Sequence, residues 1–180
     1  EDLLKFPKFA EFMQRKGTRK SAEVVLNDDD KDDLTPSERM DRALDEIHNV
    51  LANDILDKLL NEPPAFFEAT VVDLFQTMGY GTGRVVGQSG DNGIDGVIDQ
   101  DKLGLERVYI QAKRYQLDTK INSADIRNFA GSLSLHQANK GLFVTTTQFS
   151  SSAKETADKL PNRIVLIDGY QLATLMIEYN

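Results

Sequence analysis

The sequence predicts an α/β fold in which a mixed central β-sheet is flanked by helices. Two short runs of alternating apolar and polar residues, 94–99 and 107–113, are separated by a turn signal at 100–104 and are typical of a β-hairpin. A third apolar run, 141–147, follows a segment of helical periodicity, and strand, helix and strand in succession indicate a parallel pair. A sheet with both kinds of pairing is expected to be covered by helices, with right-handed crossovers between its parallel strands.

Two helices are predicted before the hairpin. The first begins at the capping box Thr35-Pro36-Ser37-Glu38, with proline at the first helical position, and ends near Pro63-Pro64. The second carries Glu68 in its first turns and is closed by Gly79. Apolar residues recur at helical spacing in both, at Met40, Leu44, Ile47, Leu51, Ile55 and Leu59 in the first and at Phe67, Val71, Leu74 and Met78 in the second.

Seven of the twelve glycines lie between Gly79 and Gly96. Turns and loops are expected there, with a short edge strand at 84–86. A nucleotide-binding loop is the alternative, but the segment contains no G-x-x-x-x-G-K-[ST] motif, and GYGTG does not match the dinucleotide fingerprint.

The elements after the hairpin follow from capping signals and apolar runs. Ser123 is expected to cap a helix, and Ser152-x-x-Glu155 predicts a capping box that opens a short helix to Leu160. Residues 163–167 read as a strand, and Asp168-Gly169 turns into a terminal helix. From the second helix onward the predicted order is α-β-β-β-α-β-α-β-α.

Composition limits the class of protein. With 180 residues, 40% of them hydrophobic and 28% charged, the chain can bury one sizeable core and carry an accessory segment. No apolar run approaches the ~20 residues of a membrane helix, and the charged start is unlike a signal peptide. The absence of cysteine fits a cytoplasmic protein. Because the chain starts at Glu1 rather than at a methionine, a preceding domain is expected to be missing.

The net charge of −8 is unevenly distributed. Five aspartates between Asp28 and Asp33 form a run without apolar periodicity, which is typical of a solvated linker. From Glu106 to Arg163, by contrast, nine basic residues stand against five acidic ones. A locally positive face on an acidic protein is compatible with binding of phosphate groups.

The predicted hairpin places metal-binding chemistry at one point. Asp95 lies on its first strand, and Gln111 and Lys113 lie two residues apart on the second. Side chains two apart on a strand share a face, so Gln111 and Lys113 point the same way. Ile110 and Ala112 then point into the core, and cross-strand pairing can bring Asp95 beside the first pair. A carboxylate, a second oxygen ligand and an ammonium group together can hold Mg²⁺ on a phosphate and steady an attacking water.

Each of these residues also has a structural alternative. Asp95 would be a hairpin-terminal aspartate bonded to backbone, Gln111 an ordinary polar strand residue, and Lys113 the partner of Asp95 in a salt bridge. Glu68 would be a solvated acid that the helix dipole favours near a helix start.

Five ordered blocks of sequence resemble the catalytic domain of the Mrr restriction endonucleases, in the PD-(D/E)xK superfamily. The blocks are FFEATVVDLFQTMGYG, GDNGIDGVI, LGLERVYIQAKR, KGLFVTTTQFS and LIDGYQLATLMIE. The resemblance implies a restriction-endonuclease-like fold over about Thr35 to Asn180, and an Mg²⁺-dependent endonuclease, with Mn²⁺ as a substitute, acting on DNA that carries methylated bases. It assigns the central metal ligand to Asp95, a variable metal-ligand position to Gln111, the catalytic lysine to Lys113 and a helix-borne catalytic acid and metal ligand to Glu68.

The same resemblance suggests a division of the chain. Residues 1–34 would be a linker or the tail of a preceding domain that reads the modified base, 35–64 a helical segment, and 65–180 the nuclease domain. Contacts to DNA are expected from Lys113, Arg114, Arg127, Gln148 and Ser150. For Arg127 a solvated helix face is the alternative, and for Ser150 it is simple capping of the following helix.

Two other functions remain open from the sequence. One is a catalytically silent module of the same fold that only binds DNA, against which the intact set of Asp95, Gln111 and Lys113 argues. The other is an oligomerisation module built on the 35–60 helix, which would make a second copy of the chain a partner, in a homodimer or a higher homo-oligomer. Neither a membrane nor a zinc site is expected.

Overall fold

The computed structural model describes residues 34–86 and 93–179. The contacts divide the chain into two compact units, residues 1–41 and 42–180. The boundary falls inside helix α2 (Pro36–Asn61), and every strand of the sheet lies in the second unit. None of the helices described is both long and apolar enough to cross a membrane.

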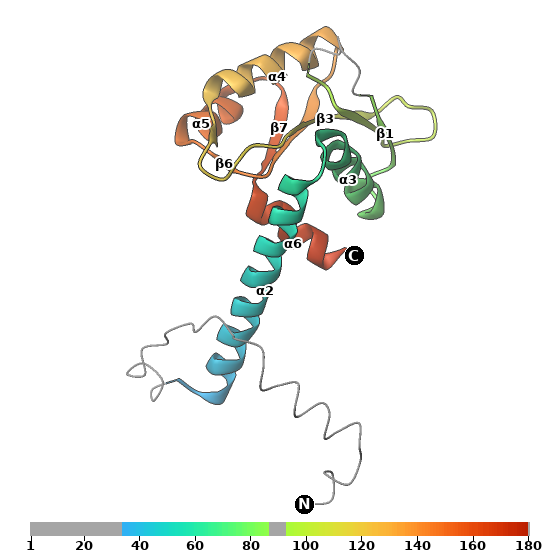
Figure 1. The fold of residues 1–180 in the computed structure, drawn as a ribbon. Helices are drawn as coiled ribbons and strands as arrows, with labels where there is room; N and C mark the ends of the chain where they lie inside the picture. The colour runs from blue at the N-terminus through green and yellow to red at the C-terminus, as the bar shows by residue number, and fades with distance from the viewer. Residues whose placement is uncertain (1–33, 87–92, 180) are drawn as a thin grey trace, which may run out of the picture. The chain divides into compact units, whose positions relative to one another are not determined.

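The second unit is built on a five-stranded mixed sheet with the order β1-β2-β3-β5-β7 (Figure 1). Antiparallel pairing joins β1 (Thr82–Val85), β2 (Gly96–Asp99) and β3 (Arg107–Lys113) into a meander. The strands β5 (Lys140–Thr145) and β7 (Arg163–Ile167) continue the sheet in parallel from β3. The predicted fold class, the hairpin and the parallel pair are therefore confirmed.

Helices cover both faces of the sheet (Figure 1). One face packs against α3 (Pro64–Thr77), α6 (Gly169–Glu178) and the end of α2, through a core that contains Phe67, Phe75, Ile98, Ile110 and Leu172. The other face packs against α4 (Ser123–Leu135) and α5 (Ser151–Lys159), through a core that contains Ile121, Ile126, Phe129, Phe143 and Phe149. The central strands β3 and β5 are consequently buried on both sides, as is usual for parallel pairs.

Two predicted helix caps were wrong by one and by two residues. Asn122, not Ser123, caps α4, and it forms a capping box with Asp125. Ser150 caps α5 through its hydroxyl, which accepts from the Ala153 N–H. In both places several residues in a row are able to cap, and the cap falls on the one whose backbone is still extended.

A second, two-stranded sheet was not predicted. It pairs β4 (Lys120–Ile121) with β6 (Gln148–Phe149) in parallel. Strands of two residues are too short to show a period, so no sequence pattern indicates them. This small sheet explains why the backbone stays extended up to Ser150, because the N–H of Ser150 donates to the carbonyl of Ile121.

The apolar stripe of α2 has two different surroundings. Towards its C-terminal end, Ala52, Leu56 and Leu59 are buried against the rest of the second unit. Earlier in the helix, Leu44 and Ile47 keep 48% and 61% of their surface exposed. The predicted helix is present, but of the predicted stripe only Ile55 and Leu59 pack against a core, while Leu51 keeps 41% of its surface exposed. The other buried residues, Ala52 and Leu56, lie outside that stripe.

Candidate active site

Asp95 lies directly before β2 and is attached to β3 by two hydrogen bonds. Its backbone N–H donates to the carbonyl of Ile110 at 2.8 Å, which extends the β2–β3 ladder by one residue. Its carboxylate Oδ2 accepts from the backbone N–H of Ala112 at 2.7 Å. The structure therefore places the carboxylate against the β3 residue that lies between Gln111 and Lys113. The backbone contact expected of a hairpin-terminal aspartate is present as well.

Gln111 is buried, with 6% of its surface exposed, and its side-chain oxygen Oε1 has no hydrogen-bond partner among the residues that the structure describes. Its Nε2 faces Gly93, where an added Cβ would lie only 2.6 Å away, and Gly93 has a φ of +83°, which favours glycine. A buried acceptor without a donor costs about 1–3 kcal/mol and is uncommon in folded proteins. An amide oxygen left in this state beside a carboxylate is suited to binding a cation.

Lys113 ends β3 and is half-buried. The alternation of the strand places it on the same face as Gln111, so the amide and the ammonium group follow one another along one side of the sheet. Its backbone carbonyl accepts from the Thr145 hydroxyl at 2.7 Å, which fixes the end of the strand.

Glu68 reaches this place from α3 because that helix lies unusually close to β2. A Cβ added to Gly96 would lie 2.5 Å from Val72 Cγ2, so a side chain at Gly96 would push the helix away. Glu68 precedes Val72 by four residues and thus lies on the same face of α3, one turn closer to the start of the helix. That turn is beside Asp95, the residue before Gly96.

The electrostatics of Glu68 show the same arrangement. Partial burial raises the pKa of the Glu68 carboxyl above its ordinary value, and the negative charge of Asp95 raises it further. The positive charge of Lys113 acts on that pKa in the opposite direction. The three charges are therefore close enough to influence one another, with Asp95 as the repelling partner and Lys113 as the attracting one.

The oxygen donors at this point are two carboxylates and one amide. No group of three or more His, Cys, Asp or Glu side chains suited to a metal occurs in the described part of the chain. The set of Asp95, Glu68 and Gln111 contains only hard oxygen atoms, which Mg²⁺ prefers over nitrogen or sulfur. The unpartnered Gln111 oxygen shows that these residues fit such an ion.

The remaining predicted DNA contacts have varied surroundings. Arg114 is turned to α2, where its Nη1 donates to the carbonyl of Leu60 near the end of that helix, a structural contact that the sequence did not predict. Ser150 is occupied as the cap of α5. Arg127 lies exposed on α4 and Gln148 lies exposed on β6.

Three consecutive buried threonines support the site and were missed. Thr145 donates to the Lys113 carbonyl, Thr146 donates to the Tyr115 carbonyl at 2.7 Å, and Thr147 donates to the Thr119 carbonyl. They hold the segment that leaves β3 after the lysine. The available signal was three hydroxyl side chains in a row at the end of an otherwise apolar strand, where each needs a buried partner.

Known proteins are similar to this chain in sequence and in fold. The model of the Mrr catalytic domain, a restriction endonuclease family, matches residues 59–176. Over 148 residues the chain is 43% identical to the Type IV methyl-directed restriction enzyme EcoKMrr of Escherichia coli (strain K12), a match that covers 80% of this chain and 48% of that protein. The chain thus spans about half the length of this curated relative.

Two solved structures have a fold similar to that of this chain. The MspJI restriction endonuclease in complex with a 27-mer oligonucleotide has a TM-score of 0.58 and 24% identity, over 74% of this chain and 32% of that one. The DNA modification-dependent restriction endonuclease AspBHI has a TM-score of 0.58 and 17% identity, over 73% of this chain and 35% of that one. At these identities the likeness concerns the fold. The family match, which runs from the end of α2 through most of α6, shows more: the chain belongs to the Mrr family of restriction endonucleases.

Proposed function

We propose that this chain is the cleavage domain of a modification-dependent restriction enzyme and that it hydrolyses DNA phosphodiester bonds with Mg²⁺. The observation that carries the proposal is the buried Gln111 oxygen without a partner beside the Asp95 carboxylate, with Lys113 next on the same face. Membership in a restriction endonuclease family supports the reaction class.

The cation would be held by Asp95, Gln111 and Glu68. When bound, it supplies Lewis-acid stabilisation of the charge that develops on the phosphate. Mn²⁺ has similar ligand preferences and would substitute for it. Asp95 is held in position for this role by the Ala112 N–H, so its carboxylate needs no rearrangement before an ion binds.

Lys113 would act on the reacting groups directly. An ammonium group at the end of β3 can steady the attacking water and stabilise negative charge on the phosphate. The contacts of Thr145 with the Lys113 carbonyl fix the strand from which the side chain projects. Glu68 must be ionised to bind a cation, and its raised pKa makes that step sensitive to pH.

The exposed residues Arg127 and Gln148 would contact the DNA backbone, within a segment of net positive charge from Glu106 to Arg163. Arg114 and Ser150 already have structural partners, so their part in binding would be indirect.

Recognition of the modified base would lie in another part of the protein. Reading a methyl group needs a pocket or a groove contact, whereas cleavage needs only the cation, the lysine and the phosphate. The relative that is named methyl-directed is about twice as long as the match. The chain alone is therefore expected to bind DNA weakly, without regard to methylation and with a steep dependence on salt. We also propose that the protein is located in the cytoplasm, where it has access to DNA.

A role of α2 in oligomerisation would be a second function beside DNA cleavage. The observation in its favour is the exposed apolar face of that helix, where Leu44, Ile47 and Val50 keep 48%, 61% and 62% of their surface exposed. A homodimer or larger homo-oligomer that covers this face would bring two nuclease sites together.

The test is incubation of the chain with supercoiled plasmid, methylated or unmethylated, in Mg²⁺, in Mn²⁺ and in EDTA. We expect slow nicking in either metal, none in EDTA, and equal rates on the two plasmids. Nicking in EDTA would contradict the metal-dependent reaction. A strong preference of this chain for methylated plasmid would show that the reader lies within these 180 residues. Binding of DNA without nicking in either metal would favour the catalytically silent module.

A further inference from the structure

A hollow of about 390 Å³ lies on the face of the sheet that carries Asp95 and Gln111. Its floor is apolar and is formed by Val97 and Ile94 with Val86. One of its lining residues, Ile94, directly precedes Asp95 of the candidate active site in the chain. Its volume is within the range of ordinary ligand-binding clefts.

Two arginines from neighbouring strands border this hollow. Arg84 lies opposite Val97 on β1 and β2, and Arg107 lies opposite Asp99 on β3 and β2. Residues two apart on a strand share a face, so both arginines project on the side of Val97 and Asp99. Gln111 follows Arg107 by four residues on β3 and therefore lies on that side too.

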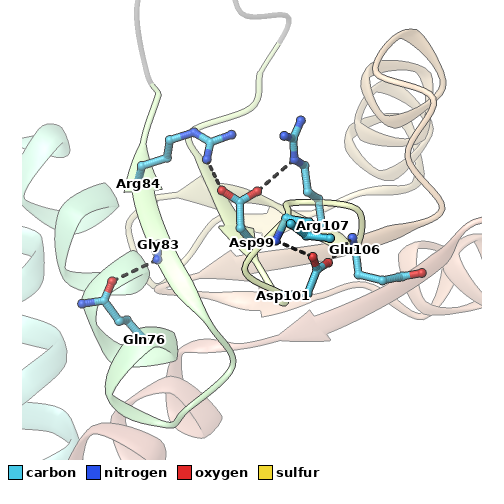
Figure 2. Close-up of polar contacts among 8 residues, drawn as sticks. Gln76, Gly83, Arg84, Asp99, Asp101, Glu106 and Arg107 are labelled. Atoms are coloured by element: carbon cyan, nitrogen blue, oxygen red, sulfur yellow. Dashed lines mark hydrogen bonds and ion pairs between the residues drawn. The ribbon is translucent and has the colours of Figure 1, made fainter.

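Asp99 holds the two guanidinium groups together. Its Oδ1 accepts from Arg107 Nε at 2.9 Å, and its Oδ2 accepts from Arg84 Nη1; Figure 2 shows the carboxylate between the two arginines. The arginine side chains still keep 47% (Arg84) and 43% (Arg107) of their surface exposed. A guanidinium has five N–H donors, so most donors of this pair are not used by Asp99.

The far wall of the hollow is an aromatic stack. The rings of Tyr109 and His136 lie 5.3 Å apart at an interplanar angle of 30°, and His136 is the C-cap residue that follows α4. Arg107 also interacts with the Tyr109 side chain, a contact that raises the pKa of Arg107. The guanidinium of Arg107 is thus fixed from two sides, by Tyr109 and by Asp99.

The charges of this cluster favour a singly charged anion. Two arginines and one aspartate leave one positive charge, and exposed ion pairs of this kind contribute little to folding stability. Fixed guanidinium donors with a surplus charge are the arrangement that recognises phosphate. Along β3, Arg107 lies four residues from Gln111, or about 13 Å at ~3.3 Å per residue.

We propose that Arg84 and Arg107, held together by Asp99, bind a backbone phosphate of the substrate DNA on the face of the sheet that carries Gln111, about 13 Å along β3 from that residue. The proposal rests on the nuclease function proposed above, since it makes this cluster a second anchor for the same DNA. The apolar floor and the Tyr109–His136 stack would lie under the sugar of that nucleotide.

The test is a measurement of DNA affinity without divalent metal, over a range of salt concentrations, by fluorescence anisotropy of a labelled duplex. The variant is the double substitution Arg84→Gln and Arg107→Gln. The matched control is Arg163→Gln, an exposed arginine at the start of β7, on the opposite edge of the sheet. The double variant should bind about tenfold more weakly at 0.1 M salt, with a log–log salt slope lower by about 0.9 for the lost phosphate contact. The control should keep at least half of the wild-type affinity.

If the affinity of the chain for DNA is too low for the anisotropy measurement, NMR provides a second readout. The Nε–Hε signals of Arg84 and Arg107 are followed by NMR as duplex is added to millimolar concentration, with Arg163 as the internal reference. Shifts at the two arginines and none at Arg163 are expected. Unchanged affinity and slope in a folded double variant, together with unshifted signals, would overturn the proposal.

The outcome is separable from the nuclease function. If the wild type nicks plasmid and the double variant binds DNA like wild type, the phosphate site is wrong and the proposed function stands. If the wild type does not nick DNA but the double variant loses affinity, the phosphate site stands and the proposed reaction fails.

Discussion

Two carboxylates near the opposite ends of the β2–β3 hairpin, Asp101 in its turn and Glu68 on the neighbouring helix α3, are in opposite states. At the turn, Asp101 accepts from the backbone N–H groups of Leu103 and Glu106, and these bonds, the one from Glu106 first, lower the pKa of its carboxyl (Figure 2). At the other end, burial and the charge of Asp95 raise the pKa of Glu68. Asp101 at the turn is therefore stabilised in its charged form by hydrogen-bond donors, whereas burial and a neighbouring negative charge disfavour the charged form of Glu68.

The same contrast holds for the uncharged and positively charged groups. At the turn, Lys140 pairs with Glu106 at 2.6 Å and with the Gln100 amide oxygen at 3.2 Å. At the other end, the buried Gln111 oxygen has no hydrogen-bond partner within the described segments 34–86 and 93–179. Polar groups that the fold leaves unsatisfied are destabilising on their own, and they cluster where a ligand can satisfy them. The comparison therefore supports the proposal that the chemistry takes place at the Asp95 end.

The largest expected effect is on cleavage. Lys113→Ala should lower the nicking rate by a factor of about 100–1,000, which is the scale for loss of one charge-stabilising group. Its melting temperature should stay within a degree or two of wild type, since a half-buried strand lysine contributes little to stability. The control is Lys102→Ala in the exposed turn, which should nick at the wild-type rate. A Lys113→Ala protein that nicks DNA normally would remove this residue from the mechanism.

Next in size is a difference in stability between two aspartates of one hairpin. Asp95→Ala leaves the buried Ala112 N–H without an acceptor, which should cost about 1–3 kcal/mol. Asp99→Ala removes the ion-pair partner of two half-exposed arginines and should cost about 0–1 kcal/mol. Urea unfolding of both variants measures the difference. Equal losses would mean that the two ends are not held in different ways.

Gln111→Glu sharpens the comparison by adding a charge where a cation is expected. Metal affinity should rise on the order of tenfold, because a charged oxygen replaces a neutral one. Without metal, the melting temperature should fall, since a third carboxylate would stand beside Asp95 and Glu68; saturating Mg²⁺ should restore it. Gln116→Glu, at an exposed position, is the matched control and should change neither quantity. Calorimetric titration with Mg²⁺ measures the metal affinity of both variants and of the wild type. Weaker metal binding by Gln111→Glu would exclude this position as a ligand.

The smallest effect is a pair of opposite pH dependences. Because the pKa of Glu68 is raised on folding, its contribution to stability is present at low pH and is lost as pH rises through the folded-state value. Glu68→Gln should therefore melt slightly higher than wild type at neutral and alkaline pH, and equally at acidic pH. For Asp101 the pKa is lowered on folding, so Asp101→Asn should melt lower than wild type at neutral pH, with the difference disappearing as the pH falls. Melting curves from pH 3 to 9 would show whether the signs differ, and equal signs would break the comparison.

Much of the fold could be predicted because its signals are local. Alternation with period two and a turn segment define the hairpin, and helical spacing with Pro63-Pro64 defines the break between α2 and α3. The exposed half of α2 could not be predicted, because spacing shows that a face is apolar and not what covers it. The strands β4 and β6 are too short to give any pattern.

The candidate site also has a part that local sequence patterns predict and a part that depends on tertiary contacts. The neighbourhood of Asp95, Gln111 and Lys113 follows from strand pairing, which the sequence indicates. The approach of Glu68 depends on the close contact of Gly96 with Val72, a tertiary feature that no local pattern contains. The contact of Arg114 with the Leu60 carbonyl also joins residues that are distant in the chain. No local pattern indicates such a contact, and the sequence therefore predicts DNA binding for Arg114.

The most direct test of the central claim is a titration of the ¹⁵N-labelled chain with Mn²⁺, followed by NMR. Paramagnetic broadening should appear first at the amides of Asp95 and Ala112 and at the side-chain NH₂ of Gln111, while the amides of Leu103 and Glu106 at the turn stay sharp. Broadening that begins at the turn, or that spreads evenly over both ends of the hairpin, would contradict the assignment of the metal site to the Asp95 end.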